Sequence, residues 1–441
     1  MTTCRIPRSI AQEMRDDLTR PHAFAAERIG FAFTRSSRSV DGRSTWILVT
    51  GYDPVLDDEY IDDPTVGARI NSSAIRRVMQ RVITTGEGAF HVHIHEHEGE
   101  PGLSYVDREE LRPLMQSIRN ASPTSDHGIL LLSQDSARME VLSPGTTSFK
   151  CASHISVIGY PMGLLCHEES RHHDEERFSR QSFLGEDSEE RISTYRIGIV
   201  GLGGGGSHIA QQLAHIGFVH LALFDSDCVE ASNLNRLVGA TAADARKGTA
   251  KADIAARVIK GINPKAKIDV VKKRWQDDPD RLKACDLIFG CVDGFAERRD
   301  LEVVARRYLI PYVDIGLDVH QSGDEPPRMA GQIILSMPGG PCLTCIGFLT
   351  ETKLIREAER YGVAGPRPQV VWANGILAST AVGVGIDLLT DWTRSLRGPV
   401  YLSYDSNTGE IQPHKRLAYL SSGPCPHFPF SQLGDPVFKP L

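Results

Sequence analysis

A glycine-rich segment, GLGGGGS from Gly201 to Ser207, constrains the fold of this chain more than any other feature of its sequence. It lies directly between an apolar stretch, RIGIV, and an amphipathic stretch, SHIAQQLAHIG. Glycines let the backbone approach a phosphate closely, and the first turn of a helix offers free amides and a favourable dipole. The pattern predicts a strand, a turn and a helix, with Gly201, Gly203, Gly204 and Gly206 around a nucleotide phosphate. A tight turn without a ligand is the plainer interpretation of the glycines alone.

The sequence after this turn alternates between strand-like and helical patterns. HLALFD is strand-like, AKADIAARVIKGI is helical, and KIDVVKKR, DLIFGCV and IPYVDIG are further strand-like stretches. Such alternation predicts a parallel sheet with helices on both faces. GQIILS is expected as an antiparallel addition, and so are PVYLSYD and EIQPHKR, which flank an Asn-Thr-Gly turn. We therefore expect an α/β fold with a Rossmann-like sheet in this half.

The sequence before the glycine-rich turn has a different character. RIGFAFT, STWILVTGY, GAFHVHIH and HGILLLS are strand-like, and SSAIRRVMQRVI is helical, which indicates an α+β domain. A charged stretch, CHEESRHHDEERFSR, separates the two halves. A chain of 441 residues is also too long for one ordinary core. We expect a first domain at 1–165, a linker and entry helix at 166–190, and a second domain at 191–441.

Composition excludes several classes of protein. Hydrophobic residues make up 41% of the chain and charged residues 24%, as in globular domains. A net charge of −7 gives no reason to expect nucleic acid as a partner. No apolar run is expected to be long enough for a membrane span, and the start lacks a signal-peptide core, so we expect a cytoplasmic protein. The nine cysteines show no disulfide-like pattern, and in a reducing compartment they should be thiols.

The residues after the glycine-rich turn indicate which nucleotide is bound. Asp225 ends the next predicted strand about twenty residues on, where an acid can bind ribose hydroxyls, but this does not choose between NAD and ATP. Further motifs follow: DSDCVEASNLNR, Lys251 in GTAKA, and CVDG at 291–294, with RFSRQSFLG upstream at 177–185. In order and spacing they resemble the ThiF/MoeB superfamily of ubiquitin-activating-enzyme-like adenylyltransferases, over roughly residues 176 to 428.

The same residue types suit the attack of a carboxylate on the α-phosphate of ATP. Two anions repel each other in this reaction, so fixed cations must stabilise the extra negative charge of the transition state. Arg236 and Lys251 are the candidate cations, and Asp293 offers the oxygen ligand that magnesium prefers. The resemblance assigns Asp225 to the ribose, Asn233 and Arg236 to the phosphates, Lys251 as the catalytic lysine, Asp293 to magnesium, and Arg180 to the triphosphate held by a partner subunit. That last role implies a homodimer.

The resemblance to the ThiF/MoeB superfamily also implies a structural zinc site. Cys342 and Cys345, in PCLTC, match its first half, and Cys425 and His427, in GPCPHF, are the candidates for the second half. A tetrahedral Cys₃His site suits zinc. The alternative is a metal-free turn with ordinary buried thiols.

The chain departs from the thioester-forming members of this family. Those members carry a cysteine in the crossover segment after the first cysteine pair, whereas residues 346–424 contain none. Cys228 and Cys291 lie within the nucleotide motifs and are interpreted as small buried residues. The sequence therefore indicates an acyl-adenylate without an enzyme thioester, from which a conjugating enzyme or a sulfur donor could take the acyl group directly.

A second constellation, FHVHIHEHEGEPGLSYVD, runs from Phe90 to Asp107. Its four histidines occupy alternate positions, so on a strand they would share one face. The pattern resembles the JAMM (JAB/MPN-type) isopeptidase motif, His-x-His followed by Ser-x-x-Asp. The resemblance implies a JAB/MPN-like domain in which His93, His95 and Asp107 bind zinc, Glu27 is the general base and Ser104 polarises the oxyanion. Three protein ligands leave an open zinc position where bound water becomes acidic, and a glutamate can take its proton.

The choice of histidines rests on spacing. His93 and His95 place Ser104 within one residue of the usual spacing, so we prefer this pair to His91 with His93 or His95 with His97. A catalytically inactive domain of the same fold, or a histidine-rich surface strand beside an acidic loop, would also produce this pattern.

The nucleotide motifs and the histidine-rich motif both predict chemistry at the carboxyl end of a small protein. We expect the first domain to trim a ubiquitin-like or sulfur-carrier protein, or to cleave its conjugates, and the second to adenylate it in a bacterial conjugation pathway. Activation of a sulfur carrier for cofactor or amino-acid biosynthesis is one alternative. A NAD-dependent oxidoreductase with a histidine-rich metal-binding arm is another, and a scaffold with two inactive domains is a third.

Overall fold

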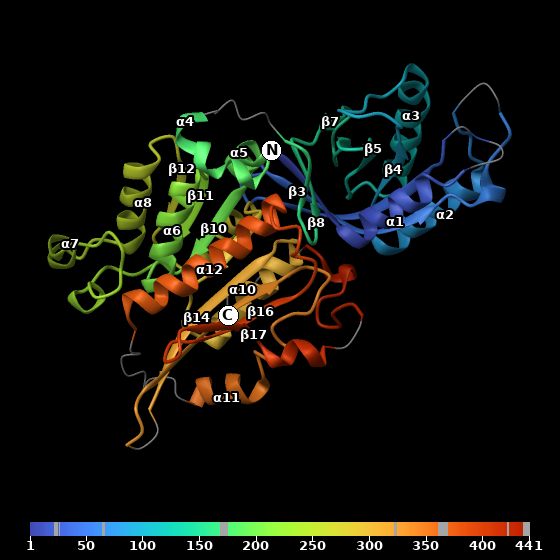
Figure 1. Ribbon diagram of the computed structural model, residues 1–441. Helices are drawn as coiled ribbons and strands as arrows, with labels where there is room; N and C mark the ends of the chain where they lie inside the picture. The colour runs from blue at the N-terminus through green and yellow to red at the C-terminus, as the bar shows by residue number, and fades with distance from the viewer. Residues whose placement is uncertain are drawn as a thin grey trace. The chain divides into compact units, whose positions relative to one another are not determined.

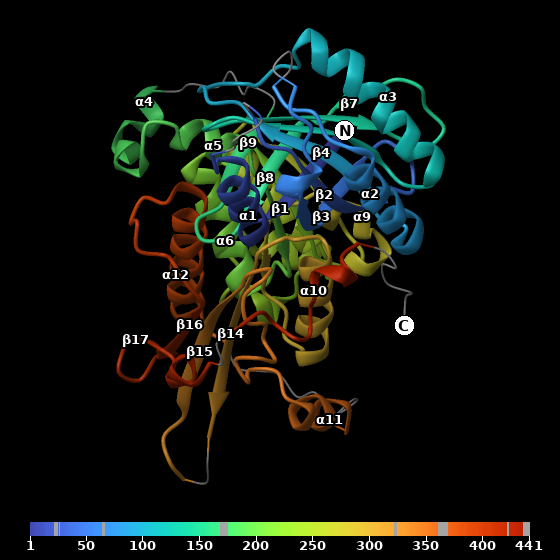
Figure 2. The ribbon, with the colours of Figure 1, turned by 90° about the vertical axis from the view of Figure 1, so that its right-hand side faces the viewer.

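The computed structural model describes residues 1–21, 25, 27–63, 67–167, 175–321, 324–359, 369–420 and 423–434. The chain forms two compact units (Figures 1 and 2). The first comprises Met1–Gly159, Gly163–Glu168 and Pro429–Pro436. The second comprises Tyr160–Met162, Glu169–Phe428 and Val437–Leu441.

The first unit is built on a nine-stranded mixed sheet with the order β7-β6-β5-β4-β2-β3-β1-β8-β9. The strands are β1 (Thr2–Pro7), β2 (Gly30–Arg38), β3 (Thr45–Pro54), β4 (Gly88–Ile94), β5 (His127–Leu132), β6 (Ala137–Leu142), β7 (Lys150–Cys151), β8 (His154–Ile158) and β9 (Gly163–Cys166). β4 pairs in parallel with β5 and antiparallel with β2, so the sheet of this half is mixed.

Three helices cover this sheet: α1 (Arg8–Leu18), α2 (Ser72–Thr85) and α3 (Tyr105–Ala121). Alternate residues of β4 belong to different cores. Phe90 and Val92 pack in the core that contains α1, whereas Ala89 packs in the core that contains α2 and α3. Because side chains alternate along a strand, His91 and His93 share the face of Ala89.

The second unit contains an eight-stranded sheet with the order β12-β11-β10-β13-β14-β15-β16-β17. The strands are β10 (Arg196–Val200), β11 (His220–Phe224), β12 (Lys267–Val271), β13 (Leu287–Gly290), β14 (Tyr312–His320), β15 (Arg328–Ser336), β16 (Val400–Asp405) and β17 (Glu410–Pro413). The first five in spatial order pair in parallel, and the last three join antiparallel. The predicted Rossmann-like sheet with late antiparallel additions is confirmed.

The helices of this unit connect and cover the strands. They are α4 (Glu175–Phe178), α5 (Ser188–Thr194), α6 (Gly204–Ile216), α7 (Ala242–Lys247), α8 (Lys251–Ile262), α9 (Pro279–Lys283), α10 (Phe295–Arg307), α11 (Glu351–Glu359) and α12 (Val371–Thr390). The first two, with the 3₁₀ segment η2 (Ser179–Leu184), occupy the predicted linker and entry helix, of which 168–174 lies outside the described residues.

α12 contradicts the expectation that no apolar run reaches the length of a membrane span. It has 20 residues and a mean hydropathy of 1.3, enough to cross a membrane by length and composition. However, 56% of the 18-residue apolar stretch of this helix is buried, and the helix packs on α6, β14 and β15 (Figure 1). Leu377, Ala381 and Leu388 are fully enclosed. The apolar character of this helix therefore supplies part of the core.

Candidate nucleotide site and candidate metal centres

A pocket of about 270 Å³ opens where β10, β11 and β13 end, beside the middle of β14. The carboxyl ends of parallel strands are where open α/β sheets bind ligands. Seven of the predicted residues line this pocket: Gly201, Gly203, Gly204, Asp225, Arg236, Lys251 and Asp293. Residues from four separate motifs thus meet in one cavity.

The glycine-rich turn needs its glycines for two different reasons. Gly201 has φ +86°, in the left-handed region, and a Cβ there would lie 2.5 Å from the carbonyl oxygen of Cys291. Gly206 does not line the pocket, but a Cβ on it would overlap the carbonyl oxygen of Gly201, so this glycine permits the turn to pack. Gly205, which the sequence analysis did not single out, lines the pocket instead. α6 begins at Gly204, so its first turn borders the cavity.

Asp225 follows β11 and holds the glycine-rich turn. Its Oδ2 accepts a hydrogen bond from the amide of Leu202 at 2.7 Å, and its Oδ1 accepts one from the amide of Asp227 at 2.8 Å. Burial raises the pKa of Asp225, and the nearby Lys251 opposes that shift. A carboxylate has about four acceptor positions, so two remain for a ligand hydroxyl.

The two candidate cations are held by neighbouring groups. The Nζ of Lys251, at the start of α8, forms an ion pair with Asp227 Oδ2 at 2.8 Å. The Nη1 of Arg236 donates to the carbonyl oxygen of Ser232 at 2.8 Å and to Asn235 Oδ1 at 3.0 Å. These contacts are exposed, so a phosphate can replace them with stronger charge-assisted bonds.

Asp293 lies in the loop that follows β13, and its exposed carboxylate lines the pocket. The Nε2 of Gln369 donates to Asp293 Oδ1 at 3.4 Å. An exposed carboxylate beside a phosphate-binding turn is the kind of ligand with which magnesium is held together with phosphate oxygens and waters. The donor set at this position therefore fits magnesium.

Besides Gly206, two predicted residues lie outside the pocket lining. Asn233 ends the short 3₁₀ segment η3 (Ala231–Asn233), and its side-chain oxygen accepts a hydrogen bond from the amide of Glu230 at 3.1 Å. Arg180, in η2, is exposed and does not line the pocket of its own chain.

Several lining residues were not predicted. Lys273, Arg274 and Trp275 follow the carboxyl end of β12, which is a position that the strand order would have singled out. Glu297 and Arg298 come from the first turns of α10. Burial raises the pKa of Glu297, and a hydrogen bond from Trp275 opposes that shift. The predicted motif CVDG ends at Gly294, a few residues before Glu297 and Arg298. Their nearness to this motif is the sequence feature that could have indicated them as pocket residues.

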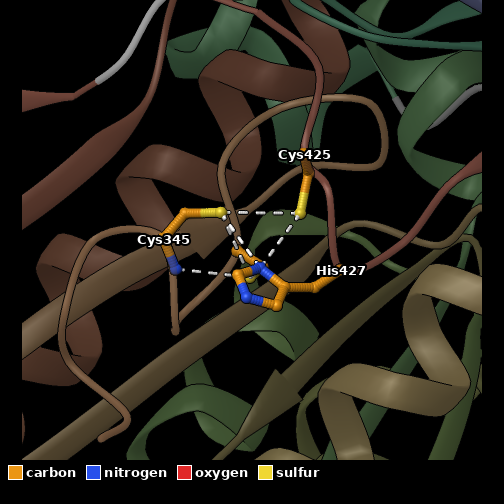
Figure 3. A group of neighbouring side chains, drawn as sticks. Cys345, Cys425 and His427 are labelled. Carbon is orange, nitrogen blue, oxygen red and sulfur yellow. Dashed lines mark hydrogen bonds between the residues drawn. The ribbon is translucent and has the colours of Figure 1, made fainter.

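The second unit also contains the predicted Cys₃His group, whose four ligand atoms lie within 4.8 Å of one another. Figure 3 shows Cys345, Cys425 and His427 pointing toward one another. Cys345 Sγ lies 3.6 Å from the sulfurs of Cys342 and Cys425, and the distances from His427 Nδ1 to the three sulfurs run from 3.4 to 3.9 Å. Sulfur and nitrogen ligands of a tetrahedral zinc lie about 3.5–3.8 Å apart. The group fits zinc.

One thiol of this group favours the thiolate form, whereas the other two favour the neutral thiol: the hydrogen bond to Cys425 raises the pKa of Cys342, and burial raises the pKa of Cys345. A hydrogen bond from Cys342 lowers the pKa of Cys425 to about 4, against the effect of burial. The thiolate is the form of cysteine that binds zinc.

In the first unit, His93, His95 and Asp107 form a second group with ligand atoms within 4.8 Å of one another. The Nε2 atoms of His93 and His95 are 3.1 Å apart, and His93 Nε2 is 4.0 Å from Asp107 Oδ2. Burial lowers the pKa of His93 to about 4, so its imidazole is neutral, as a metal ligand must be. Two imidazoles and one carboxylate fit an open zinc site.

Glu27 and Ser104 lie beside this group. Burial and the neighbouring Asp107 raise the pKa of the half-buried Glu27, and His95 lowers it, so the three side chains interact. Ser104 is the N-cap of α3: its Oγ accepts a hydrogen bond from the amide of Asp107 at 3.1 Å, and Asp107 Oδ2 accepts one from the amide of Ser104 at 2.9 Å. The hydroxyl hydrogen of Ser104 is not used by this cap.

His91 lies deeper than the group. It is 2% exposed, and its ring stands edge-on to Phe31 and His93. Neither ring nitrogen has a hydrogen-bond partner among the described residues. Burial lowers the pKa of His91 well below its usual value, so it stays neutral in the core.

Known proteins resemble the second unit. The chain is 28% identical over 257 residues to the SAMP-activating enzyme E1 of Haloferax volcanii, covering 57% of this chain and 87% of that protein. It is 29% identical over 250 residues to the molybdopterin-synthase adenylyltransferase of Escherichia coli, covering 55% of this chain and 92% of that protein. Among solved structures, E. coli MccB with MccA-N7isoASN aligns at 18% identity and a TM-score of 0.45, covering 56% of this chain and 73% of that chain. Residues 177–422, more than half of the chain, match the ThiF family, and the chain therefore belongs to the ThiF family.

Proposed function

We propose that the second unit uses ATP to adenylate the C-terminal carboxylate of a ubiquitin-like or sulfur-carrier protein. One observation carries this proposal: a single pocket is lined by the glycine-rich turn, by Arg236 and Lys251, and by Asp293. The names of two similar proteins, a SAMP-activating enzyme and a molybdopterin-synthase adenylyltransferase, support the same reaction class.

The reaction joins a carboxylate oxygen of the protein tail to the α-phosphorus of ATP. The bond from the α-phosphorus to the bridging oxygen breaks, and pyrophosphate leaves. Arg236 and Lys251 place positive charge where negative charge develops, and Asp225 offers acceptors to the ribose. Asp293 would hold magnesium, which neutralises phosphate charge when it is bound.

The acyl group would leave the adenylate without an enzyme thioester. Residues 346–424 contain no cysteine, which favours direct transfer to a conjugating enzyme or a sulfur donor. The exposed Arg180 supports a homodimer in which this arginine reaches the triphosphate in the other subunit. Cross-linking of the Arg180→Cys variant, but not of the wild type, to a thiol-reactive ATP analogue in the second subunit would test that arrangement.

Pyrophosphate exchange tests the adenylation. Labelled pyrophosphate should enter ATP only in the presence of the correct ubiquitin-like or sulfur-carrier protein. Lys251→Ala should lower the rate by about a hundredfold or more, because a fixed charge in such a site contributes several kcal/mol. Lys260→Ala, on the exposed side of the same helix, is the matched control and should leave the rate unchanged. No exchange with any candidate protein would contradict the proposal.

We further propose that the first unit is a zinc isopeptidase of the JAMM type. The proximity of His93, His95 and Asp107, with Glu27 interacting beside them, carries this second function. Glu27 would take a proton from water and pass it to the leaving amine, and burial raises its pKa toward the range in which a carboxyl exchanges protons. Ser104 would donate a hydrogen bond to the developing oxyanion. A zinc ion held by the three ligands would acidify the water.

Cleavage of a C-terminally extended modifier tests this function. Glu27→Gln should lower the rate by at least about a hundredfold, which is the usual contribution of a general base. Glu109→Gln, at an exposed position on α3, is the control and should cleave like the wild type. Equal rates for the Glu27 variant and the control would reject the metal mechanism and favour an inactive domain.

The two functions together would mature and activate one modifier in a bacterial conjugation pathway in the cytoplasm. Mass spectrometry of the modifier distinguishes the two proposed fates. A lysine-linked adduct indicates conjugation, whereas a thiocarboxylate indicates a sulfur carrier.

A further inference from the structure

Arg298 is a buried cation next to the nucleotide pocket. It lies in α10, is 5% exposed, and lines the pocket without projecting into solvent. Its Nη1 donates to both carboxylate oxygens of Asp314 and, at 3.1 Å, to the carbonyl oxygen of Ile315. Its Nη2 donates to the carbonyl oxygen of Val292 at 2.6 Å. The guanidinium therefore joins α10, β14 and the loop after β13.

The partner carboxylate is itself fixed. Asp314 is fully buried in β14, and it accepts further hydrogen bonds from Tyr312 Oη at 2.9 Å and from Gln332 Nε2 at 3.3 Å. A buried ion pair needs such additional bonds to offset the loss of hydration. The planar guanidinium group of Arg298 cannot rotate without breaking several of these hydrogen bonds.

The loop that Arg298 holds contains the candidate magnesium ligand. Val292 directly precedes Asp293, and the amide of Cys291 donates to the carbonyl oxygen of Val200 at 2.8 Å. The backbone before Asp293 is thus fastened to β10 on one side and to Arg298 on the other. With both attachments in place, the carboxylate of Asp293 can lie in the pocket lining.

We propose that Arg298 is a positioning residue that fixes the Asp293 carboxylate for magnesium–ATP binding in the second unit. This inference rests on the proposed adenylation and deepens it, because it assigns the geometry of the metal-binding loop to a cation whose guanidinium is bonded to the protein itself. Residues that orient a ligand from outside usually change metal affinity by about 10–100-fold when they are replaced.

The chain offers a matched control on the same helix. Arg306 lies two turns beyond Arg298 on the same face of α10 and is 2% exposed. It donates to Ser336 Oγ at 2.9 Å and to the carbonyl oxygens of Gly340 and Pro341 at 2.9 and 2.7 Å. It therefore has the same chemistry and burial, but it holds the loop that leads to Cys342.

Calorimetric titration of ATP at a series of magnesium concentrations tests the inference in the full-length protein. Arg298→Lys should raise the magnesium concentration needed for half-maximal binding by about tenfold or more. It should leave the weaker binding of ATP in EDTA within about twofold of the wild type. Arg306→Lys should stay within about twofold under both conditions, since Arg306 donates to Ser336, Gly340 and Pro341, which lie outside the loop that contains Asp293. Thermal unfolding without ligand shows whether the two variants are equally folded.

The possible outcomes distinguish a failure of the positioning role of Arg298 from a failure of the proposed adenylation. If the wild type binds no magnesium–ATP, the proposed adenylation and this inference both fail. If the wild type binds and Arg298→Lys matches Arg306→Lys, the positioning role alone is overturned. An equal loss with and without magnesium would indicate a merely structural role and would also overturn it. If Arg298→Lys does not fold, Asp314→Asn keeps the shape of the pair, and it should weaken magnesium-dependent binding more than Arg306→Lys does.

Discussion

Under the proposed function, Asp227 would compete with nucleotide phosphate for the candidate catalytic lysine. The ion pair between Lys251 Nζ and Asp227 Oδ2 is 2.8 Å long, and the side chain of Asp227 is 66% exposed while that of Lys251 is 13% exposed. Both residues line the pocket. Under the proposed function, Lys251 would exchange this carboxylate for a phosphate oxygen when ATP binds, and the free energy of the exposed pair would be subtracted from the binding free energy.

This competition leads to a prediction for Asp227→Asn. An exposed ion pair contributes up to about 1 kcal/mol, so its removal should lower the KM for ATP by up to about fivefold in pyrophosphate exchange, with kcat little changed. The control is Asp253→Asn, which breaks the 2.7 Å pair of Asp253 with Lys272, a pair outside the pocket lining. A higher KM for ATP in Asp227→Asn would mean that this carboxylate binds magnesium or ribose.

Sequence patterns predicted seven residues of the pocket lining but not the buried charges behind it. Gly201, Asp225 and Asp293 follow strands of a parallel sheet, so their positions at one edge follow from topology. Arg298 and Glu302 are different, because charged residues on a helix are normally expected at the surface. Their burial depends on Asp314 and Ser336 in later strands, and no local pattern reports those partners.

α11 is an element held mainly by polar contacts. None of its residues is buried. The carboxylate of Glu357 accepts hydrogen bonds from the amides of Phe295 and Ala296, at 2.9 and 2.8 Å, at the first turn of α10. Lys353 Nζ lies 4.7 Å from the centre of the Phe348 ring. Helix N-termini favour such carboxylates, typically by about 1 kcal/mol.

Glu357→Ala should therefore loosen α11 without unfolding the second unit. A loss of about 1 kcal/mol corresponds to about fivefold faster amide hydrogen exchange in residues 351–359. Glu359→Ala, at an exposed position on the same helix, is the control. Exchange rates that stay equal in the two variants would show that contacts other than the Glu357 carboxylate hold this helix.

Alternation and periodicity located the elements whose two sides differ in polarity. β4, β10 and α8 were predicted within a few residues of their bounds, because each has a regular apolar pattern. α12 was missed as a long apolar helix, since its sequence contains glycine, serine and threonine between the apolar residues. Those small residues allow close packing against α6, which is a tertiary reason that a local pattern does not contain.

At the scale of the whole chain, the two units contain candidate metal-binding groups of opposite character. The Cys₃His group of the second unit offers four ligands, three of them thiols, and leaves no position for water. The group of His93, His95 and Asp107 in the first unit offers three and leaves one position open. Closed thiolate sites are typical of structural zinc, and open histidine–carboxylate sites are typical of catalytic zinc.

This difference predicts two stages of metal loss. The purified protein should carry about two zinc ions per chain, as counted by elemental analysis. With magnesium in excess, a zinc chelator of increasing strength should remove the ion of the open site first, so cleavage of an extended modifier should stop while pyrophosphate exchange continues. Removal of the second ion should lower the unfolding temperature of the second unit, because structural zinc contributes directly to folding free energy.

Variants of the two groups of ligands test which zinc site is emptied at each stage of metal loss. His95→Ala should carry about one zinc ion and lose only the first stage, whereas Cys345→Ser should also carry about one and lose only the second. Because the histidine and cysteine ligands belong to different compact units, each variant should leave the unfolding temperature of the other unit unchanged. If pyrophosphate exchange stopped with the first ion removed, the adenylation would depend on the histidine site, and the assignment of separate chemistry to the two units would be wrong.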